Sequence, residues 1–447
     1  MAIWIVGWYS REMRRRSRIP GMALVAIVAV VAVPTIAVAT TSPHVVTSAP
    51  EVGVSVFFDD QALGGDQSTL ASAAKLFSYL QNDLDANAVS IDFPFYMGTA
   101  TQVVGNQSVV NAGVLEAQQS STIVAGLGTP SVQLLGGLVR LAEKDGLRVQ
   151  LRPLRSQLND DTTGVPFDNK IAGTGEWRGS INPTSPSTWF ANYFQWLKPY
   201  LVMAKETGVS SFSIGAELTS MVSATPINNT FFPSNNMPAH NYLPYWQRLV
   251  QEAQAIFGPN LLYSASHLTY QTIPGIQVGY DAYVPVDPPA NLNATYPQTQ
   301  TAASAAIQAA GAKGDNATVI SDFQAAINAS FQANNSAGAN FPSNLSSLRL
   351  EEVGIPDMAY AWTQPYYYAY SSAAIATYNE SWVQPDWITA ECNVMQSNHM
   401  SGMYIWGIDF NNFSPTNTTP SVNPYTFQNS DTVAAIHACF SKVRSGS

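Results

Sequence analysis

The chain has 447 residues, of which 11% are charged, and its formal net charge at pH 7 is −10. This length accommodates two or three domains, or one large α/β barrel with insertions, and it is ample for a buried core. The few and mostly acidic charges argue against a nucleic-acid-binding protein, which would carry basic clusters.

The N-terminus has the pattern of an export signal. Five arginines lie within residues 11–18, and the apolar run 22–33 follows them. Ala37, Val38 and Ala39 then supply a site with small residues for cleavage. We therefore predict a signal peptide over residues 1–39, and an extracellular or cell-surface protein. An uncleaved anchor that tethers the chain to a membrane through residues 22–39 is the alternative.

Strand and helix patterns alternate after a polar linker at residues 40–50. Residues 187–207 have helical spacing, and Gly208 separates them from the next strand. A second helix is expected to begin at Pro130-Ser131 and to end at Gly146. The other predicted helices are 69–84, 242–257, 319–334, 387–397 and 432–443, with insertions at 97–128 and 285–315. The predicted strands are 52–58, 88–96, 147–154, 208–218, 261–265, 276–284, 348–353 and 402–408.

Eight alternations of strand and helix indicate a parallel sheet. Over roughly 400 residues they predict one (β/α)₈ TIM barrel with loop insertions, spanning residues 51–447. A doubly wound open sheet is the alternative. It lacks support, because no glycine-rich phosphate loop follows any predicted strand.

Acidic residues end two of the predicted strands. Glu217 follows the strand within 208–218, and Glu351 and Glu352 end the strand 348–353. The carboxyl ends of barrel strands are where catalytic groups are placed. Two carboxylates facing each other there are what glycoside hydrolysis needs, one as an acid and one as a nucleophile. Other polar or aromatic residues expected at strand ends are Arg152, Asp281, Tyr283, Trp406 and Asp409. Of these, we expect Arg152, Asp281, Tyr283 and Trp406 to contact substrate.

Aromatic side chains fit the same chemistry, because sugar rings stack on them through their C–H faces. We expect Trp177, Trp362 and Trp406 to contact substrate. Trp406 is favoured because a strand delivers it beside both carboxylates. For any single tyrosine within residues 366–370, loop packing is the simpler interpretation.

Glu351 and Glu352 compete for one role. Side chains alternate along a strand, so only one of the two is expected to face the barrel centre. The frame Glu352-Val353-Gly354 selects Glu352. We expect Glu351 to face the helices or to pair with a base such as Arg349.

The chain resembles clan A glycoside hydrolases, and most closely glycoside hydrolase family 113, the β-mannanase family. Motifs in the family's order, spanning roughly residues 50 to 410, carry this resemblance. They are the blocks 177–181, 189–207, 214–218, 281–285, 352–354 and 402–406. Ala216 stands where most clan A enzymes have Asn before the acid/base residue; family 113 also lacks that Asn, so catalysis is not excluded.

The resemblance implies roles for particular residues. Glu217 corresponds to the acid/base and Glu352 to the nucleophile. Arg178 belongs to a substrate-binding block with Trp177. Arg152, where the family commonly has Lys, holds a substrate hydroxyl or a neighbouring carboxylate, or forms a structural ion pair.

The family further implies retaining cleavage, no metal or other cofactor, and a polysaccharide or oligosaccharide substrate of the β-1,4-mannan type. The rival hypothesis is a barrel that binds glycan at the cell surface without cleaving it, or a structural wall protein. Loss of either carboxylate would favour that rival, and both Glu217 and Glu352 are present. We expect a monomer in either case.

Two cysteines, Cys392 and Cys439, are present. In an exported chain such a pair predicts one disulfide, tying the last helix to the helix before it. Two buried free thiols are the alternative. No metal-binding motif or dense cluster of His and Cys is present in the sequence.

Overall fold

The computed structural model describes a barrel and the helices around it. Residues 1–48 form a unit separate from residues 49–447, and that first unit, with the predicted export signal, lies outside the described residues. No described helix is both long and apolar enough to cross a membrane. The described residues are 49–57, 66–97, 123–124, 129–155, 179, 183, 185–223, 242–266, 273–283, 324–325, 345–358, 361–363, 365, 381–410, 413 and 429–446.

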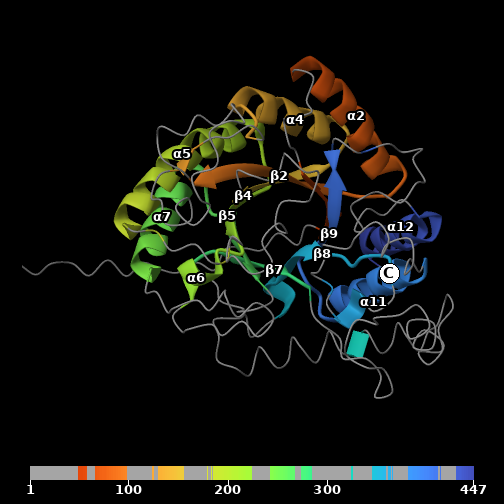
Figure 1. The fold of residues 1–447 in the computed structure, drawn as a ribbon. Coiled ribbons are helices and arrows are strands. Elements are labelled where there is room, and N and C mark those ends of the chain that lie inside the picture. Colours follow the sequence, from red (N-terminus) through yellow and green to blue (C-terminus); the bar gives the residue numbers. More distant parts are fainter. Residues whose placement is uncertain are drawn as a thin grey trace, which may run out of the picture. The chain divides into compact units, whose positions relative to one another are not determined.

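Eight parallel strands close into a barrel, seen along its interior in Figure 1. β1 pairs with β9 on one side and with β2 on the other, so the sheet has no open edge among these strands. The closure confirms the predicted (β/α)₈ barrel and excludes the open-sheet alternative. A short strand, β3 (Ile123–Val124), adds antiparallel to β2. The barrel strands are β1 Glu51–Phe57, β2 Ala88–Met97, β4 Arg148–Arg155, β5 Ser211–Ala216, β6 Leu261–Ser266, β7 Gln277–Asp281, β8 Arg349–Val353 and β9 Gly402–Asp409.

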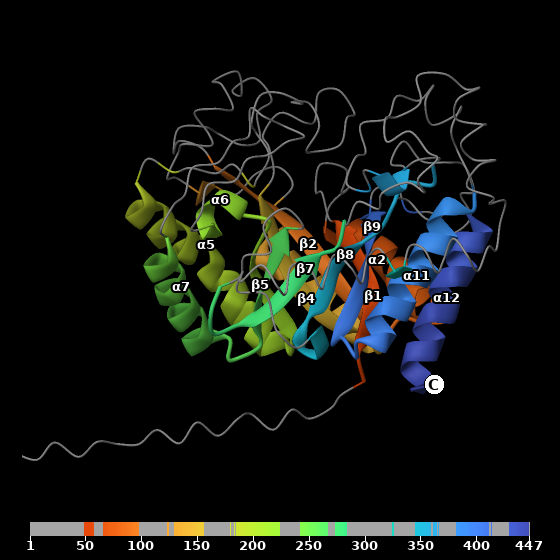
Figure 2. The ribbon, with the colours of Figure 1, turned by 90° about the horizontal axis from the view of Figure 1, so that it is seen from below.

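Helices surround the strands, as the turned view in Figure 2 shows. The main core lies between the two layers, where the aromatic rings of β2 pack on those of α5: Phe93 lies 5.0 Å from Tyr200, and Phe95 lies 5.1 Å from Tyr193, between ring centroids. The described helices are α2 Asp66–Asn82, α4 Val132–Lys144, α5 Pro186–Thr207, α6 Thr219–Val222, α7 Leu243–Ile256, α11 Val383–Ser397 and α12 Ser430–Ser445, with short 3₁₀ turns η6 (Leu345–Ser347) and η7 (Ala361–Thr363).

Local sequence signals set several element boundaries. Ser131 caps α4, and its hydroxyl accepts a hydrogen bond from the Leu134 N–H at 3.1 Å. Gly208 ends α5 with φ of 84°, a left-handed conformation that glycine adopts without steric cost. Both boundaries confirm the prediction. Most of the insertions 97–128 and 285–315, and of the predicted helix 319–334, lies outside the described residues.

Cys392 and Cys439 form the predicted disulfide. Cys392 belongs to α11 and Cys439 to α12, two neighbouring helices of the outer ring. Their Cα atoms are 5.9 Å apart, inside the range that a disulfide needs. The bond closes a loop that contains β9.

Candidate active site

The inside of the barrel is polar, whereas most barrels of this type are filled with branched aliphatic side chains. On β2, Ser90 and Asp92 alternate with Val89, Ile91 and Phe93, so the polar residues share one face of the strand. All five of these residues are buried. β4 repeats the pattern in its sequence Arg-Val-Gln-Leu-Arg, with alternating polar residues.

Arg152 is the centre of a group of charges at the mouth of the barrel. Its guanidinium contacts Asp92 through two hydrogen bonds, Nε to Oδ1 at 3.1 Å and Nη2 to Oδ2 at 2.7 Å. The same group lies 3.3 Å from Asp281 Oδ1 and 2.8 Å from Glu352 Oε1. We call Asp92, Arg152, Asp281 and Glu352 the mouth cluster. Four strands, β2, β4, β7 and β8, supply its members.

The mouth cluster is buried and holds more negative than positive charge. Burial lowers the pKa of Arg152, but the charges of Asp92, Glu352 and Asp281 outweigh it, and the net pKa lies well above the ordinary value. Burial raises the pKa of Asp281 well above its ordinary value, and the charges of Glu352 and Glu217 raise it further. Burial also raises the pKa of Asp92, against the opposing effect of Arg152. A single guanidinium therefore serves three carboxyl groups.

Glu352 is held on both of its oxygens. Oε1 faces the Arg152 guanidinium, and Oε2 accepts a hydrogen bond from the Tyr283 hydroxyl at 2.9 Å. Tyr283 follows the end of β7, the strand beside β8. The side chain of Glu352 is 2% exposed. These two contacts fix the orientation of the carboxylate at the end of its strand.

Glu217 lies immediately after β5 in a left-handed backbone conformation, with φ of 50°. Its N–H donates to the Ser264 carbonyl at 2.9 Å, and its carbonyl accepts from the Thr219 N–H at 2.7 Å. A residue with a side chain is strained by about 1–3 kcal/mol in this region, and such residues concentrate at functional sites. Ser264, whose carbonyl accepts from the Glu217 N–H, also donates its hydroxyl to Asp281, so the Glu217 backbone lies next to the mouth cluster. The charge of Glu217 raises the pKa values of both Asp281 and Tyr263.

Glu351 does not face the helices, and this part of the prediction is wrong. In the pairing of β7 with β8, Tyr280 lies opposite Leu350 and Asp281 lies opposite Glu352. Glu351 is therefore the extra residue of a β-bulge, and the bulge allows both glutamates to point into the barrel. The predicted pairing of Glu351 with Arg349 is confirmed, with Nε 2.6 Å from Oε1.

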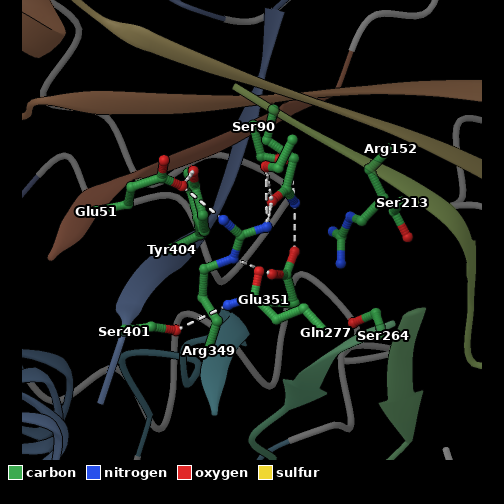
Figure 3. A network of polar contacts seen from close by, with 12 residues as sticks. Glu51, Ser90, Arg152, Ser213, Ser264, Gln277, Arg349, Glu351, Ser401 and Tyr404 are labelled. Atoms are coloured by element: carbon green, nitrogen blue, oxygen red, sulfur yellow. Dashed lines mark hydrogen bonds and ion pairs between the residues drawn. The ribbon is translucent and has the colours of Figure 1, made fainter. Parts of the chain in front are cut away.

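Asp281 and Arg152 were both predicted to contact substrate. Asp281 is fully buried, accepts a hydrogen bond from the Ser264 hydroxyl at 2.5 Å, and contacts Arg152. Arg152 is also fully buried. Of the alternatives for Arg152, the structure shows ion pairs with neighbouring carboxylates. Figure 3 shows Arg152 and Ser264 inside the barrel.

The predicted aromatic residues fall in different surroundings. Trp406 on β9 is half-buried, and the Arg152 guanidinium lies 5.4 Å from the centre of its ring. The peptide bond from Trp406 to Gly407 is cis. Trp362 is 3% exposed and packs against Trp382, with ring centroids 5.7 Å apart. Outside the described part of the chain lie Trp177, Arg178, the tyrosines within 366–370 and the side chain of Asp409.

Sequence reasoning missed two members of the site, Asp92 and Ser264. Asp92 is the one charged residue of β2 and stands at the position that faces Arg152. A carboxylate alternating with Val89, Ile91 and Phe93 was the available signal. Ser264 had no comparable signal, because serine is common in strands. No group of three or more His, Cys, Asp or Glu side chains suited to a metal ion occurs within the described ranges.

Solved structures of similar fold were found at low sequence identity. A GH113 β-1,4-mannanase structure matches 88% of this chain and 99% of its own at 14% identity, with a TM-score of 0.56. The fold is that of the GH113 β-mannanases. The GH113 β-mannanase from Alicyclobacillus acidocaldarius, in complex with ManMIm, covers 89% of this chain and 98% of its own at 15% identity, with a TM-score of 0.55.

No family model matches the sequence, and no curated protein matches it. The structural likeness to the GH113 β-mannanases therefore confirms, at the level of the fold, the resemblance that the sequence motifs indicate.

Proposed function

We propose that this protein is an exported retaining glycoside hydrolase that cleaves β-linked glycans, β-1,4-mannan or a related β-glycan. Glu352 is the nucleophile and Glu217 the acid/base. The observation that carries the proposal is the setting of Glu352: a carboxylate at a strand end, held by Arg152 and Tyr283. Glu217 stands at the end of β5 beside the same cluster.

In the first step, Glu352 attacks the anomeric carbon and the bond to the leaving group breaks. Glu217 donates its proton to the departing glycosidic oxygen, and a covalent glycosyl-enzyme forms. Arg152 and Tyr283 hold Glu352 in one orientation, so little reorganisation is needed at the moment of attack.

In the second step, Glu217 accepts a proton from water, which attacks the same carbon from the face that the leaving group vacated. Glu352 leaves, and the configuration at the anomeric carbon is retained. This scheme requires carboxyl groups about 5–5.5 Å apart, whereas inversion requires about 6.5–9.5 Å. We expect the shorter separation between Glu217 and Glu352 in a crystal structure.

The choice of a mannan-type substrate rests on the sequence resemblance together with the GH113 β-1,4-mannanases of the same fold. Trp406 would form part of the sugar-binding surface through the area of its ring that remains accessible. Trp177 and Arg178, from the segment of sequence between β4 and α5, would add contacts.

Export rests on the basic and apolar pattern of residues 1–39. Mass spectrometry of the protein recovered from the medium and from the membrane fraction tests it. A mature N-terminus just after Ala39 supports cleavage, and an intact N-terminus in the membrane fraction supports a tether. Intact protein confined to the cytosol would contradict export.

The test of catalysis begins with a screen of polysaccharides and aryl β-glycosides, followed by product analysis. Glu352→Ala should abolish turnover of every substrate found. Glu217→Ala should lose about 10²–10⁴-fold on substrates with poor leaving groups, the usual contribution of acid–base catalysis. An activated aryl group departs without that proton, so the glycosyl-enzyme should form and accumulate.

Azide needs no base, so it should rescue Glu217→Ala and yield a β-glycosyl azide. Glu352→Ala should show no rescue with retention. Glu391→Gln, a buried glutamate of the outer helix α11, is the matched control and should retain wild-type rates. Binding of a polysaccharide with no product from wild type would instead favour the non-cleaving glycan-binding barrel.

A further inference from the structure

A second polar group lies inside the barrel, closer to the N-terminal ends of the strands. We call Glu51, Gln150, Arg349, Glu351 and Tyr404 the N-terminal cluster. Gln150, Glu351 and Tyr404 are fully buried, and Arg349 is 3% exposed. Figure 3 shows Glu51, Arg349, Glu351 and Tyr404 converging in the barrel interior. None of these residues takes part in the chemistry proposed above.

Glu351 is anchored from both sides. Arg349 Nε donates to Glu351 Oε1 at 2.6 Å, and Gln150 Nε2 donates to Glu351 Oε2. Gln150 belongs to β4 and Glu351 to β8, and three strands separate them on either side of the closed barrel. Their hydrogen bond therefore spans the interior. It holds the middle of β8 against the opposite wall.

Arg349 is in turn held by other strands. Its Nη1 lies 2.6 Å from Glu51 Oε2, on β1. Its Nη2 donates to the Gln150 side-chain oxygen and to the Ser211 hydroxyl, the latter at 3.0 Å. The anchor of Glu351 is thus rigid, because each partner is itself fixed by a second contact.

The bulge in β8 sets the direction of Glu352. In a regular strand, Arg349 and Glu351 would face inward and Glu352 would face the helices. Because Glu351 is the extra residue between Leu350 and Glu352, the following residue also turns inward. The inward direction of Glu352 therefore exists only while the bulge does.

Strand β7, beside β8, leaves room for the Glu351 side chain, because it has a glycine, Gly279, at the contact. A Cβ atom at Gly279, on β7, would overlap with Cγ of Glu351. Any residue other than glycine at this position would displace Glu351 or the strand. Two features, the cross-barrel hydrogen bond and the glycine opposite, thus accommodate Glu351 in the barrel interior.

We propose that Glu351 is a positioning residue for Glu352. Its contacts with Arg349 and Gln150 hold the bulge in β8, and the bulge sets the direction in which the Glu352 carboxylate meets Arg152 and Tyr283. The expected effect on the rate of hydrolysis rests on the proposed function. Its structural part, that Glu351 sets the contacts of Glu352, is independent of any activity.

The test compares three variants with wild type. Glu351→Ala removes the anchor. The double variant Arg349→Met with Glu351→Met removes both charges together. Glu51 keeps its ion pair with Arg148 at 3.7 Å, so no buried charge is left unpaired and the fold is kept. Tyr404→Phe is the matched control, because it deletes only the hydroxyl that donates to Glu51 at 2.8 Å.

Crystal structures supply the first readout. In Glu351→Ala or the double variant, the distances from Glu352 to Arg152 Nη2 and to the Tyr283 hydroxyl should lengthen by 1 Å or more from 2.8 and 2.9 Å. They should be unchanged in Tyr404→Phe. A folded double variant with an intact bulge and unchanged Glu352 contacts would overturn the proposal, whatever the enzyme hydrolyses.

Kinetics supply the second readout, on the best aryl glycoside of the screen. A misplacement of about 1 Å costs about 10²-fold in rate, so the double variant should lose about that in kcat while KM stays within about threefold. Covalent labelling of Glu352 by the matching 2-deoxy-2-fluoro glycoside should slow equally. Glu351→Gln, which preserves the contact with Gln150, should recover most of the rate.

The two failures are distinguishable. If wild type hydrolyses no glycoside, the proposed function is wrong, and the crystal structures still decide whether Glu351 positions Glu352. If wild type is active and the folded double variant matches its kcat, only the positioning role is wrong.

Discussion

The mouth cluster and the N-terminal cluster share two strands, β4 and β8, yet they differ in charge balance. The mouth cluster sets one guanidinium against three carboxyl groups, and the pKa of Asp281 is raised as a result of burial and of the neighbouring carboxylates. The N-terminal cluster sets one guanidinium against two carboxylates, with an amide and a phenol completing the hydrogen bonds. Strands β4 and β8 thus each contribute residues to both clusters.

The difference shows that the surplus of buried carboxyl groups over cations lies in the mouth cluster, at the candidate active site. A buried carboxylate without a full complement of donors is costly, and such groups are retained where chemistry uses them. Gln150 and Ser90 connect the two clusters, because Gln150 donates to the Ser90 hydroxyl at 3.3 Å and Ser90 donates to Asp92 at 2.7 Å. Through these two hydrogen bonds the N-terminal cluster helps to hold Asp92 of the mouth cluster in place.

The largest expected effect comes from removing either guanidinium. Arg152→Met leaves three buried carboxyl groups without a cation, and Arg349→Met leaves Glu351 without one, while Glu51 keeps only Arg148 at 3.7 Å. Breaking a buried pair in this way costs about 3–5 kcal/mol. Urea denaturation at pH 7 should show a similar loss of unfolding free energy for both variants.

Activity should separate these two variants. Arg152→Met removes the direct partner of Glu352, so hydrolysis should be undetectable, whereas Arg349→Met acts only through the bulge and should retain measurable kcat. Arg152→Lys is the control for charge alone, since lysine cannot make the two hydrogen bonds to Asp92. Equal activity of the two methionine variants would remove the functional distinction between the clusters.

The disulfide lies outside both clusters and offers a comparison that leaves the barrel interior intact. Replacing Cys392 and Cys439 by alanine opens a loop of 47 residues. We expect a loss of about 2–4 kcal/mol in unfolding free energy, mainly from greater freedom of the unfolded chain. The kcat of the folded protein should be unchanged at a temperature well below its unfolding midpoint. A fall in kcat would mean that the packing of α11 and α12 affects the geometry of the active site.

Glu391 isolates the effect of burial alone. It is fully buried on α11, and burial raises its pKa to about 8. Since the unfolded value is 4.5, the folded state holds a proton that the unfolded state releases, and stability falls as pH rises from about 4.5 to about 8. Glu391→Gln does not titrate, so at pH 7 it should be more stable than wild type by about 3 kcal/mol.

Denaturation across pH checks this prediction for Glu391. The gain of Glu391→Gln should shrink steadily toward pH 4.5 and vanish below it. A gain that is constant with pH would mean that the carboxyl is already ionised in the folded protein. The mouth cluster differs, because Arg152 and serine hydroxyls act against the rise that burial causes in the pKa values of Asp92 and Asp281.

The smallest effect is expected at the surface. Arg444 of α12 pairs with Asp85, and its side chain is 39% exposed. Water and salt screen such pairs, so Arg444→Ala should cost less than about 1 kcal/mol. The unfolding free energies of Arg444→Ala and Arg152→Met, measured at low and at high salt, show how much burial increases the contribution of an ion pair to stability. A cost that equals that of Arg152→Met would contradict this view.

Much of the barrel was predictable from the sequence because its signals are local. The spacing of apolar residues identified every barrel strand, with boundaries shifted by a few residues. Ser131 and Gly208 marked helix ends through capping and left-handed geometry. The same local pattern placed Glu217 and Glu352 at strand ends, and the pair of cysteines implied their disulfide.

What the tertiary structure alone decided is how the barrel interior is shared. Glu351 and Glu352 are adjacent in the sequence, and strict alternation predicts opposite faces for them; only the register between β7 and β8 reveals the bulge. Gln150 and Glu351 are 201 positions apart and meet because β4 and β8 lie across the barrel from each other. Such contacts depend on closure and shear of the whole sheet, which no local window of sequence contains.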